Sequence, residues 1–173
     1  VRMHSDAGIR ARIRLESPPP AAVTASGNSL VMDGCAPWHA YPGYYKQGEG
    51  QMWYDPDRGI HFRTVVSVMH TGGSVGQEGE QLIVDGCTEV VLKLVNSTSF
   101  NGYDKDPVRE GKPYRELADA NAARVFEMDY GELLRRHEED YRSLFDGVTL
   151  DLGRTDADLK ALPTDEQWKG DAD

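Results

Sequence analysis

Short stretches in which apolar and polar residues alternate, separated by Gly, Asp and Pro, fill the first two thirds of the chain. In residues 9–16 every second side chain is apolar and the others are charged, and residues 60–70 show a similar alternation. A period of two is that of a β-strand with one buried face. Several such strands in series, with no helical stretch between them, predict an antiparallel β-sandwich rather than alternating β and α units.

Three more apolar stretches extend the predicted sandwich. They are SLVMDG at 29–34, QLIVDG at 81–86 and TEVVLKLVN at 88–96. The last is apolar on both faces, which is typical of a central strand. The pair Gly72 and Gly73 predicts a turn after the strand at 60–70. We therefore expect the sandwich portion to occupy residues 1–112, so that the chain is mainly β.

The period changes from two to nearly four after about residue 113. Apolar side chains recur at helical spacing from Tyr130 to Phe145, and Asp129 stands where a helix N-cap is expected. A weaker pattern predicts another helix from Pro113 to about Glu127. A helical region should therefore follow the sandwich.

The last forty residues contain fewer apolar side chains. VTLDLG at 148–153 has the alternation of one more strand, and the residues from 154 onward are rich in acidic side chains. We expect a helical linker segment with a returning strand at 113–153, followed by an acidic linker at 154–173. Because the sequence begins at Val1 and ends in a polar stretch, we also expect it to be a piece of a longer polypeptide.

The charge balance limits the kinds of partner. The chain has 19 Lys and Arg residues against 29 Asp and Glu residues, which gives a net charge of −10. Nucleic acids and anionic membrane surfaces need clustered positive charge, so neither is expected as a partner. No run of residues approaches the ~18 apolar residues of a membrane span, and no signal peptide opens the sequence.

Aromatic residues are concentrated in a Gly- and Pro-rich stretch at 38–54. The rings belong to Trp38, Tyr41, Tyr44, Tyr45, Trp53 and Tyr54, and His39 lies among them. Flat rings in a loop suit carbohydrate binding, because the C–H face of a sugar stacks on an aromatic ring. The alternative is a long loop held in place by its own rings. The candidates for binding are Trp38, His39, Tyr45 and Trp53.

A second cluster, STSFNGYDKDP at 97–107, follows the expected central strand. Its candidate residues for contacting a polyol or lining a cleft are Asn101, Tyr103, Asp104 and Lys105. The alternative is structural, since Asn-Gly and Asp-Pro are ordinary turn formers.

Metal and cysteine chemistry receive little support. Cys35 and His39 have a possible metal-ligand spacing, but no second Cys and His pair accompanies them, so we expect no metal and no cofactor. Cys35 and Cys87 are compatible with a disulfide or with two free thiols. The 29 carboxylates are too many for sequence spacing to select a glycosidase acid–base pair.

Three stretches carry a resemblance to a known family. They are YDPDRGIHFRTVVSV at 54–68, VVLKLVNSTSFNGYDKDP at 90–107, and YGELLRRHEEDYRSLFDGVTLDLG at 130–153 with LPTDEQ at 162–167. Their order and spacing resemble the N-terminal domain of glycoside hydrolase family 95, the α-L-fucosidases that act on α-1,2-linked fucose. The resemblance covers nearly the whole chain. Gln167 and Trp168 depart from it, because Arg and Leu are usual there.

The resemblance implies the second half of the N-terminal β-sandwich, a partial super-sandwich, and the linker towards an (α/α)6 barrel. The family's inverting hydrolysis uses a glutamic acid and an aspartate of that barrel, and nothing here matches their motifs. We therefore expect no catalytic residue in this chain and no activity from it alone. The implied partners are its own catalytic barrel and fucosylated glycans, and the implied location is periplasmic or extracellular. The alternative function is a stand-alone carbohydrate-binding module that uses the aromatic loop at 38–54.

Overall fold

The computed structural model describes residues 1–42, 44, 52–151 and 153–170. The chain divides into two compact units, Val1–Leu133 and Leu134–Asp173. In the described part of the chain, the strands and the first helix belong to the first unit. The expected candidate Tyr45 lies outside the described residues.

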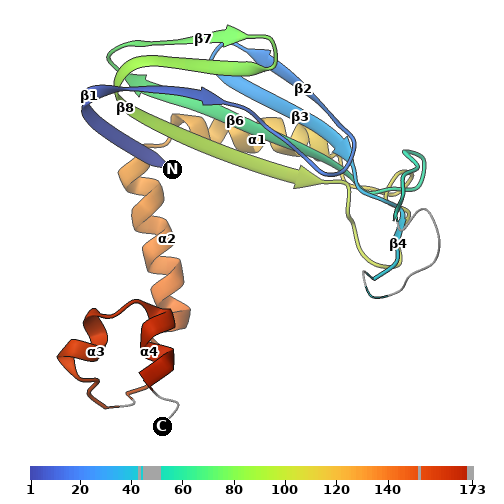
Figure 1. Cartoon of the computed structure of the whole chain (residues 1–173). Coiled ribbons are helices and arrows are strands. Elements are labelled where there is room, and N and C mark those ends of the chain that lie inside the picture. Colours follow the sequence, from blue (N-terminus) through green and yellow to red (C-terminus); the bar gives the residue numbers. More distant parts are fainter. Residues whose placement is uncertain (43, 45–51, 152, 171–173) are drawn as a thin grey trace. The chain divides into compact units, whose positions relative to one another are not determined.

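The first unit is built around one antiparallel sheet with the strand order β1-β8-β6-β3-β2 (Figure 1). Its strands are β1 (Arg2–Ile13), β2 (Ala21–Ser26), β3 (Ser29–Cys35), β6 (His61–Thr71) and β8 (Gln81–Thr98). Strand β7 (Ser74–Glu78) pairs with β8, and the two-residue strands β4 (His39–Ala40) and β5 (Met52–Trp53) pair with each other. The strands predicted at 29–34 and 60–70 are confirmed as β3 and β6.

Strand β8 unites the two strands predicted at 81–86 and 88–96. The chain passes through Gly86 with a φ of 70° instead of turning there, and Gly8 lies beside it in β1 with a φ of 83°. The β1–β8 register shifts between His4 and Ile9, which marks a bulge that bends both strands. The second layer that folds over the main sheet consists of β7, the first part of β8, and the residues of β1 from Ile9 to Ile13 that pair with it (Figure 1).

The hydrophobic core fills the space between these two β layers. Leu30 of β3 and Val68 of β6 pack with Leu82 and Val84 of the folded-over part of β8. All four side chains are almost fully buried. This packing of one β layer on another is a sandwich, so the predicted mainly β, antiparallel sandwich followed by a helical region is confirmed.

Helix α1 (Tyr114–Glu127) covers the opposite face of the main sheet (Figure 1). Ala118 and Ala122 stand one turn apart on its buried side, where their small side chains contact Val65 of β6. Small residues let a helix approach a sheet closely, so the helix is seated on the sheet rather than held at a distance. The helix predicted from Pro113 to about Glu127 is confirmed.

Charged groups hold α1 to the sheet at two places, one in its first half and one at its C-terminal end. Arg63 of β6 donates to Asp33 of β3 at 2.9 and 2.7 Å and to Asp119 of α1 at 3.0 and 2.8 Å. The Arg63 hydrogen bonds keep the pKa of the Asp33 carboxyl below its usual value. At the C-terminal end, Lys93 of β8 is only 5% exposed and donates to the carbonyl oxygens of Phe126, at 3.0 Å, and of Met128.

Helix α2 (Tyr130–Phe145) forms as predicted, and Asp129 caps its first turn. The Asp129 carboxylate accepts the backbone N–H of Gly131 at 2.6 Å and that of Glu132 at 3.3 Å. None of the described α2 side chains is fully buried. Among the described residues, no helix has both the length and the apolar character needed to cross a membrane.

The returning strand predicted at 148–153 is wrong for the described residues of that range, which have no regular secondary structure. Val148 and Leu150 are strongly exposed, and neither is paired with a strand among the described residues. The region from 154 onward contains two short helices, α3 (Ala157–Ala161) and α4 (Thr164–Gly170). Asp156 caps α3 by accepting the Asp158 N–H at 2.8 Å.

Candidate functional site

The candidate residues lie in two segments at one end of the main sheet (Figure 1). The ends of β3 and β8 and the start of β6 meet there, because Cys35 pairs with His61 and Thr98 pairs with Phe62. The connections from β3 to β6 and from β8 to α1 therefore emerge side by side. We call the described residues of 36–60 and 99–113 the loop end.

A buried serine joins these two segments at their base. The backbone N–H of Ser99 donates to the His61 carbonyl at 2.8 Å, and its hydroxyl oxygen accepts the His61 N–H at 3.0 Å. The Ser99 carbonyl accepts the Lys112 N–H at 3.0 Å. The His61 ring contacts the Pro56 carbonyl at 2.7 Å and stacks on Tyr114 at 5.8 Å. Burial raises the pKa of the Tyr114 hydroxyl. The base of the loop end is thus rigidly specified.

The aromatic part of the loop end is held together mainly by contacts between its own rings. The Trp38 N–H donates to the Trp53 carbonyl at 2.9 Å, which closes the β4–β5 hairpin. His39 lies 5.1 Å from the Trp53 ring and meets Tyr41 edge-on at 4.8 Å. The Arg58 guanidinium covers one face of Trp38 at 3.6 Å. Three of the four aromatic candidates are thus brought together, with Trp38 and Trp53 each still 39% exposed.

The polar part of the loop end is a turn stabilised from within. The Asn101 side-chain amide donates to the Glu110 carbonyl at 2.8 Å. The Asp106 carboxylate accepts the N–H groups of Arg109 at 2.9 Å and Val108 at 2.8 Å, and these donors lower the pKa of Asp106. Asn101 is therefore used in building the turn, as the structural alternative predicts.

The remaining polar candidates are on the outside of this turn. Tyr103 is 98% exposed, and Lys105 makes one long ion pair with Glu110 at 3.6 Å. Asp104 is also exposed, and its carboxylate lies close to Gly102, whose φ is 125°. Tyr103, Asp104 and Lys105 are therefore the members of this group that a ligand or a second protein surface can reach.

Sequence reasoning missed Arg58, Ser99 and Tyr114, which position the candidates without being candidates themselves. Arg58 belongs to the stretch at 54–68 that carries the family resemblance, so that motif was the available signal. Ser99 lies in the stretch at 90–107 that also carries the resemblance, but its contact with His61 depends on the pairing of β6 with β8. Tyr114 has no such signal in the sequence.

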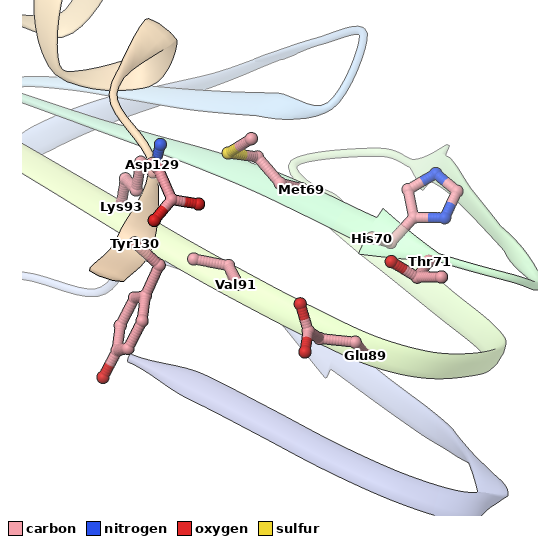
Figure 2. A pocket seen from close by; sticks show the side chains of 8 residues that line it. All are labelled: Met69, His70, Thr71, Glu89, Val91, Lys93, Asp129 and Tyr130. Atoms are coloured by element: carbon pink, nitrogen blue, oxygen red, sulfur yellow. The ribbon is translucent and has the colours of Figure 1, made fainter. Parts of the chain in front are cut away.

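A small cavity of about 160 Å³ lies at the other end of the main sheet (Figure 2). Its lining residues are Met69, His70, Thr71, Glu89, Val91, Lys93, Asp129 and Tyr130. The charged members have partners within the chain, since Glu89 pairs with Arg2, Lys93 holds the end of α1 and Asp129 caps α2. The cavity is therefore part of the structural scaffold.

The described residues contain no group of three or more His, Cys, Asp or Glu side chains that could hold a metal ion. Cys35 and Cys87 are both free thiols, which resolves the alternative left by the sequence. Burial and the neighbouring Asp55 raise the pKa of the Cys35 thiol, so it is a weaker nucleophile than an ordinary cysteine at neutral pH.

Comparisons with known proteins agree with this fold. The chain is 33% identical over 102 residues to the Alpha-L-fucosidase 2 of Arabidopsis thaliana, an alignment that covers 57% of this chain and 12% of that protein. The sequence model of the family described as "Glycosyl hydrolase family 65, N-terminal domain" matches residues 1–103. That range contains the whole sandwich and the start of the polar turn. The expected N-terminal sandwich of a glycoside hydrolase is confirmed, and the chain belongs to the Glycosyl hydrolase family 65 N-terminal domain family.

Proposed function

We propose that this chain is the non-catalytic N-terminal sandwich domain of a glycoside hydrolase that, as a whole protein, removes terminal α-1,2-linked L-fucose with inversion. The observation that carries the proposal is the match of residues 1–103 to the family, together with the likeness to Alpha-L-fucosidase 2. The family-95 resemblance of the sequence supplies the linkage and the stereochemistry. The acid and the base of the reaction then lie outside this chain, in an (α/α)6 barrel.

The exposed side of the loop end is the surface we assign to that barrel. Tyr103 is almost fully exposed, Phe100 is half exposed, and the neighbouring Asp104 and Lys105 are exposed as well. An aromatic group surrounded by charged side chains is typical of an interface between domains of one protein. Tyr103 and Asp104 would then be buried in the seam between sandwich and barrel rather than in contact with the sugar.

A second candidate function is that of a free carbohydrate-binding module. The partial exposure of Trp38 and Trp53 favours this function, because a sugar ring could contact the accessible part of each indole. Against it, the rings of the loop meet one another at tilted and edge-on angles, and Arg58 already occupies one face of Trp38. A sugar-stacking platform needs an open ring face.

A proton NMR time course of this chain with an α-1,2-fucosylated lactose separates these functions. Released fucose gives new anomeric signals, and binding broadens the lines of the oligosaccharide in the same tube. We expect neither from the isolated domain. Broadening without release would support the binding module, and release by a preparation free of other enzymes would overturn the non-catalytic assignment.

A chimera tests the enzymatic context directly. Residues 1–103 would replace the matched segment of the Arabidopsis Alpha-L-fucosidase 2, and fucose release would be measured beside the unaltered enzyme. We expect the chimera to retain release, because the segment supports a barrel rather than supplying catalytic groups. A chimera that is folded by circular dichroism but inactive contradicts this role. The glycan substrate also implies export of the whole protein to the periplasm or the extracellular space, which fractionation of the producing cells would test.

A further inference from the structure

The two edges of the main sheet differ in how well they are protected against pairing with another strand. The strand order places β1 at one edge and β2 at the other. Unpaired edge strands attract further strands unless charges, prolines or bulges blunt them. Strand β1 has such protection, because it contains a bulge and carries arginines that form surface ion pairs. Strand β2, with the sequence AAVTAS, contains no charged residue, no proline and no bulge.

The backbone pairing of β2 with β3 shows which of its groups are free. The register is regular from Ala21 opposite Gly34 to Ser26 opposite Ser29. Just before the strand, the Pro20 carbonyl accepts the Cys35 N–H at 3.2 Å, so the groups of Pro20 face β3. Inward and outward groups alternate along an antiparallel strand.

The N–H and C=O groups of Ala22, Thr24 and Ser26 therefore also face β3. Those of Ala21, Val23 and Ala25 face outward. Within the described residues, no backbone hydrogen bond to another segment occupies these three outward positions.

A groove with both apolar and polar lining residues, among them Glu16 and Glu80, runs beside this edge on the core face of the sheet. Leu15, Val23 and Met32 line it, together with Ala21 and the polar residues that follow β1. The side chains of Val23 and Ala25 lie on that face, because their partners Met32 and Leu30 are core residues. A strand added to β2 would place its own side chains over this groove.

We propose that two copies of this chain join through antiparallel pairing of β2 with β2, centred on Val23. A two-fold axis at Val23 sets Val23 opposite its symmetry mate and Ala21 opposite Ala25 of the second copy, so the same six outward groups of each strand satisfy one another. Strand β2 itself carries no charged side chain that would meet its like across the axis, whereas pairing of β1 with itself would bring arginines together. The two central valines would extend the apolar surface of the groove across the axis.

The net charge of −10 opposes this association at low ionic strength. Added salt screens the repulsion between the two copies while leaving backbone hydrogen bonds intact. We therefore expect salt to favour the dimer.

The test is sedimentation of the full chain over about two decades of concentration, at low and high salt. We expect the mass to rise from 19.2 kDa towards twice that value, more readily at high salt. Val23→Pro removes an outward N–H and should stay monomeric, since proline is tolerated on the free side of an edge strand. Its melting temperature should match that of wild type at low concentration, where both are monomers. Ala22→Pro is the matched control, and it should lower the melting temperature because its N–H belongs to the ladder with β3.

Amide hydrogen exchange supplies a readout independent of mass. Raising the protein concentration should slow exchange at Val23 and Ala25, while Ala22 and Thr24 are protected at every concentration. A wild-type chain that stays monomeric at high salt, or a Val23→Pro variant that still dimerises, would overturn the proposal. Growth beyond a dimer would also overturn it, because a closed two-fold contact cannot propagate.

Discussion

The Nζ atom of Lys93 lies 3.0 Å from the carbonyl oxygen of Phe126, so a buried ammonium of the central strand binds the last turn of α1. Cations at a helix C-terminus satisfy carbonyl groups that have no partner within the helix, and they interact favourably with the helix dipole. The Lys93 contact and the ion pair of Arg63 with Asp119 both join α1 to strands of the sheet, so the helix is part of the same compact unit as the sandwich.

Replacing Lys93 by methionine should destabilise the domain by about 2 kcal/mol, because two carbonyl groups at the end of α1 lose a charged donor. Chemical denaturation measures the change. Lys105→Met is the control, and it should change stability by less than about 0.5 kcal/mol since the Lys105 pair is exposed and long. Equal midpoints for Lys93→Met and wild type would contradict the role of this contact.

The Arg63–Asp33 pair predicts a pH dependence of stability. The folded pKa of Asp33 lies below its unfolded value of about 3.9, so its contribution is complete above that value and is lost as pH falls through the folded pKa. Asp33→Asn should therefore lower the melting temperature clearly at pH 7, and the difference from wild type should shrink in strong acid. Calorimetry at several pH values measures this, and a difference that does not depend on pH would refute it.

Three glycine-to-alanine changes around β7 should separate strain from steric clash. Gly73 has a φ of 54°, and a Cβ there would stand 2.3 Å from the Asp85 carbonyl oxygen, so Gly73→Ala should cost about 3 kcal/mol or more. Gly79 has a φ of 60° but open space around it, so about 1 kcal/mol is expected from backbone strain alone. Gly76 has neither problem and should change stability by less than about 0.5 kcal/mol. A urea midpoint of Gly73→Ala that is not the lowest of the three would contradict the close approach of Gly73 to the Asp85 carbonyl.

Ser99→Ala should loosen the base of the loop end. The change removes the acceptor of the His61 N–H in a buried place, which should cost about 1–2 kcal/mol. Limited proteolysis should then cut the segments at 36–60 and 99–113 faster than in wild type. The exposed Ser74→Ala serves as the control and should leave both the stability and the cleavage pattern unchanged. Equal cleavage rates in Ser99→Ala and wild type would count against the anchoring role.

The elements that the sequence predicts well are those with a strong period and one clearly buried face. Strand β6 and helix α2 have such periods, and both form close to the expected bounds. Strands β2 and β7 were missed because AAVTAS and SVGQE each contain a single large apolar side chain. Their pairing comes from the neighbouring strands β3 and β8, which a local pattern does not contain. Gly86 separates two predicted strands in the sequence, whereas in the structure β8 continues through it with a φ of 70°, beside Gly8 of β1.

In the candidate site, too, contacts between residues close in the sequence could be predicted, and contacts between distant residues could not. Trp38, His39 and Trp53 belong to one aromatic-rich stretch of the sequence, and the pairing of β4 with β5 brings them together. The use of Asn101 in a turn depends on the position of the Glu110 carbonyl, which only the backbone conformation determines. The contacts of His61 with Ser99 join residues 38 positions apart, and no local motif indicates them.

The position of β8 has a consequence for synthesis on the ribosome. Within the part of the chain that the structure describes, β1 pairs with β8 alone, and Arg2 lies opposite Val91. Within this chain, β1 is therefore synthesised about seventy to ninety residues before the segments of β8 that pair with it. During that interval its apolar side chains depend on chaperones or transient contacts for shelter. The large sequence separation between β1 and β8 also makes their pairing a late and slow event in refolding. A stalled nascent chain that ends before β8 should therefore be bound by ribosome-associated chaperones, whereas a chain that includes β8 should not.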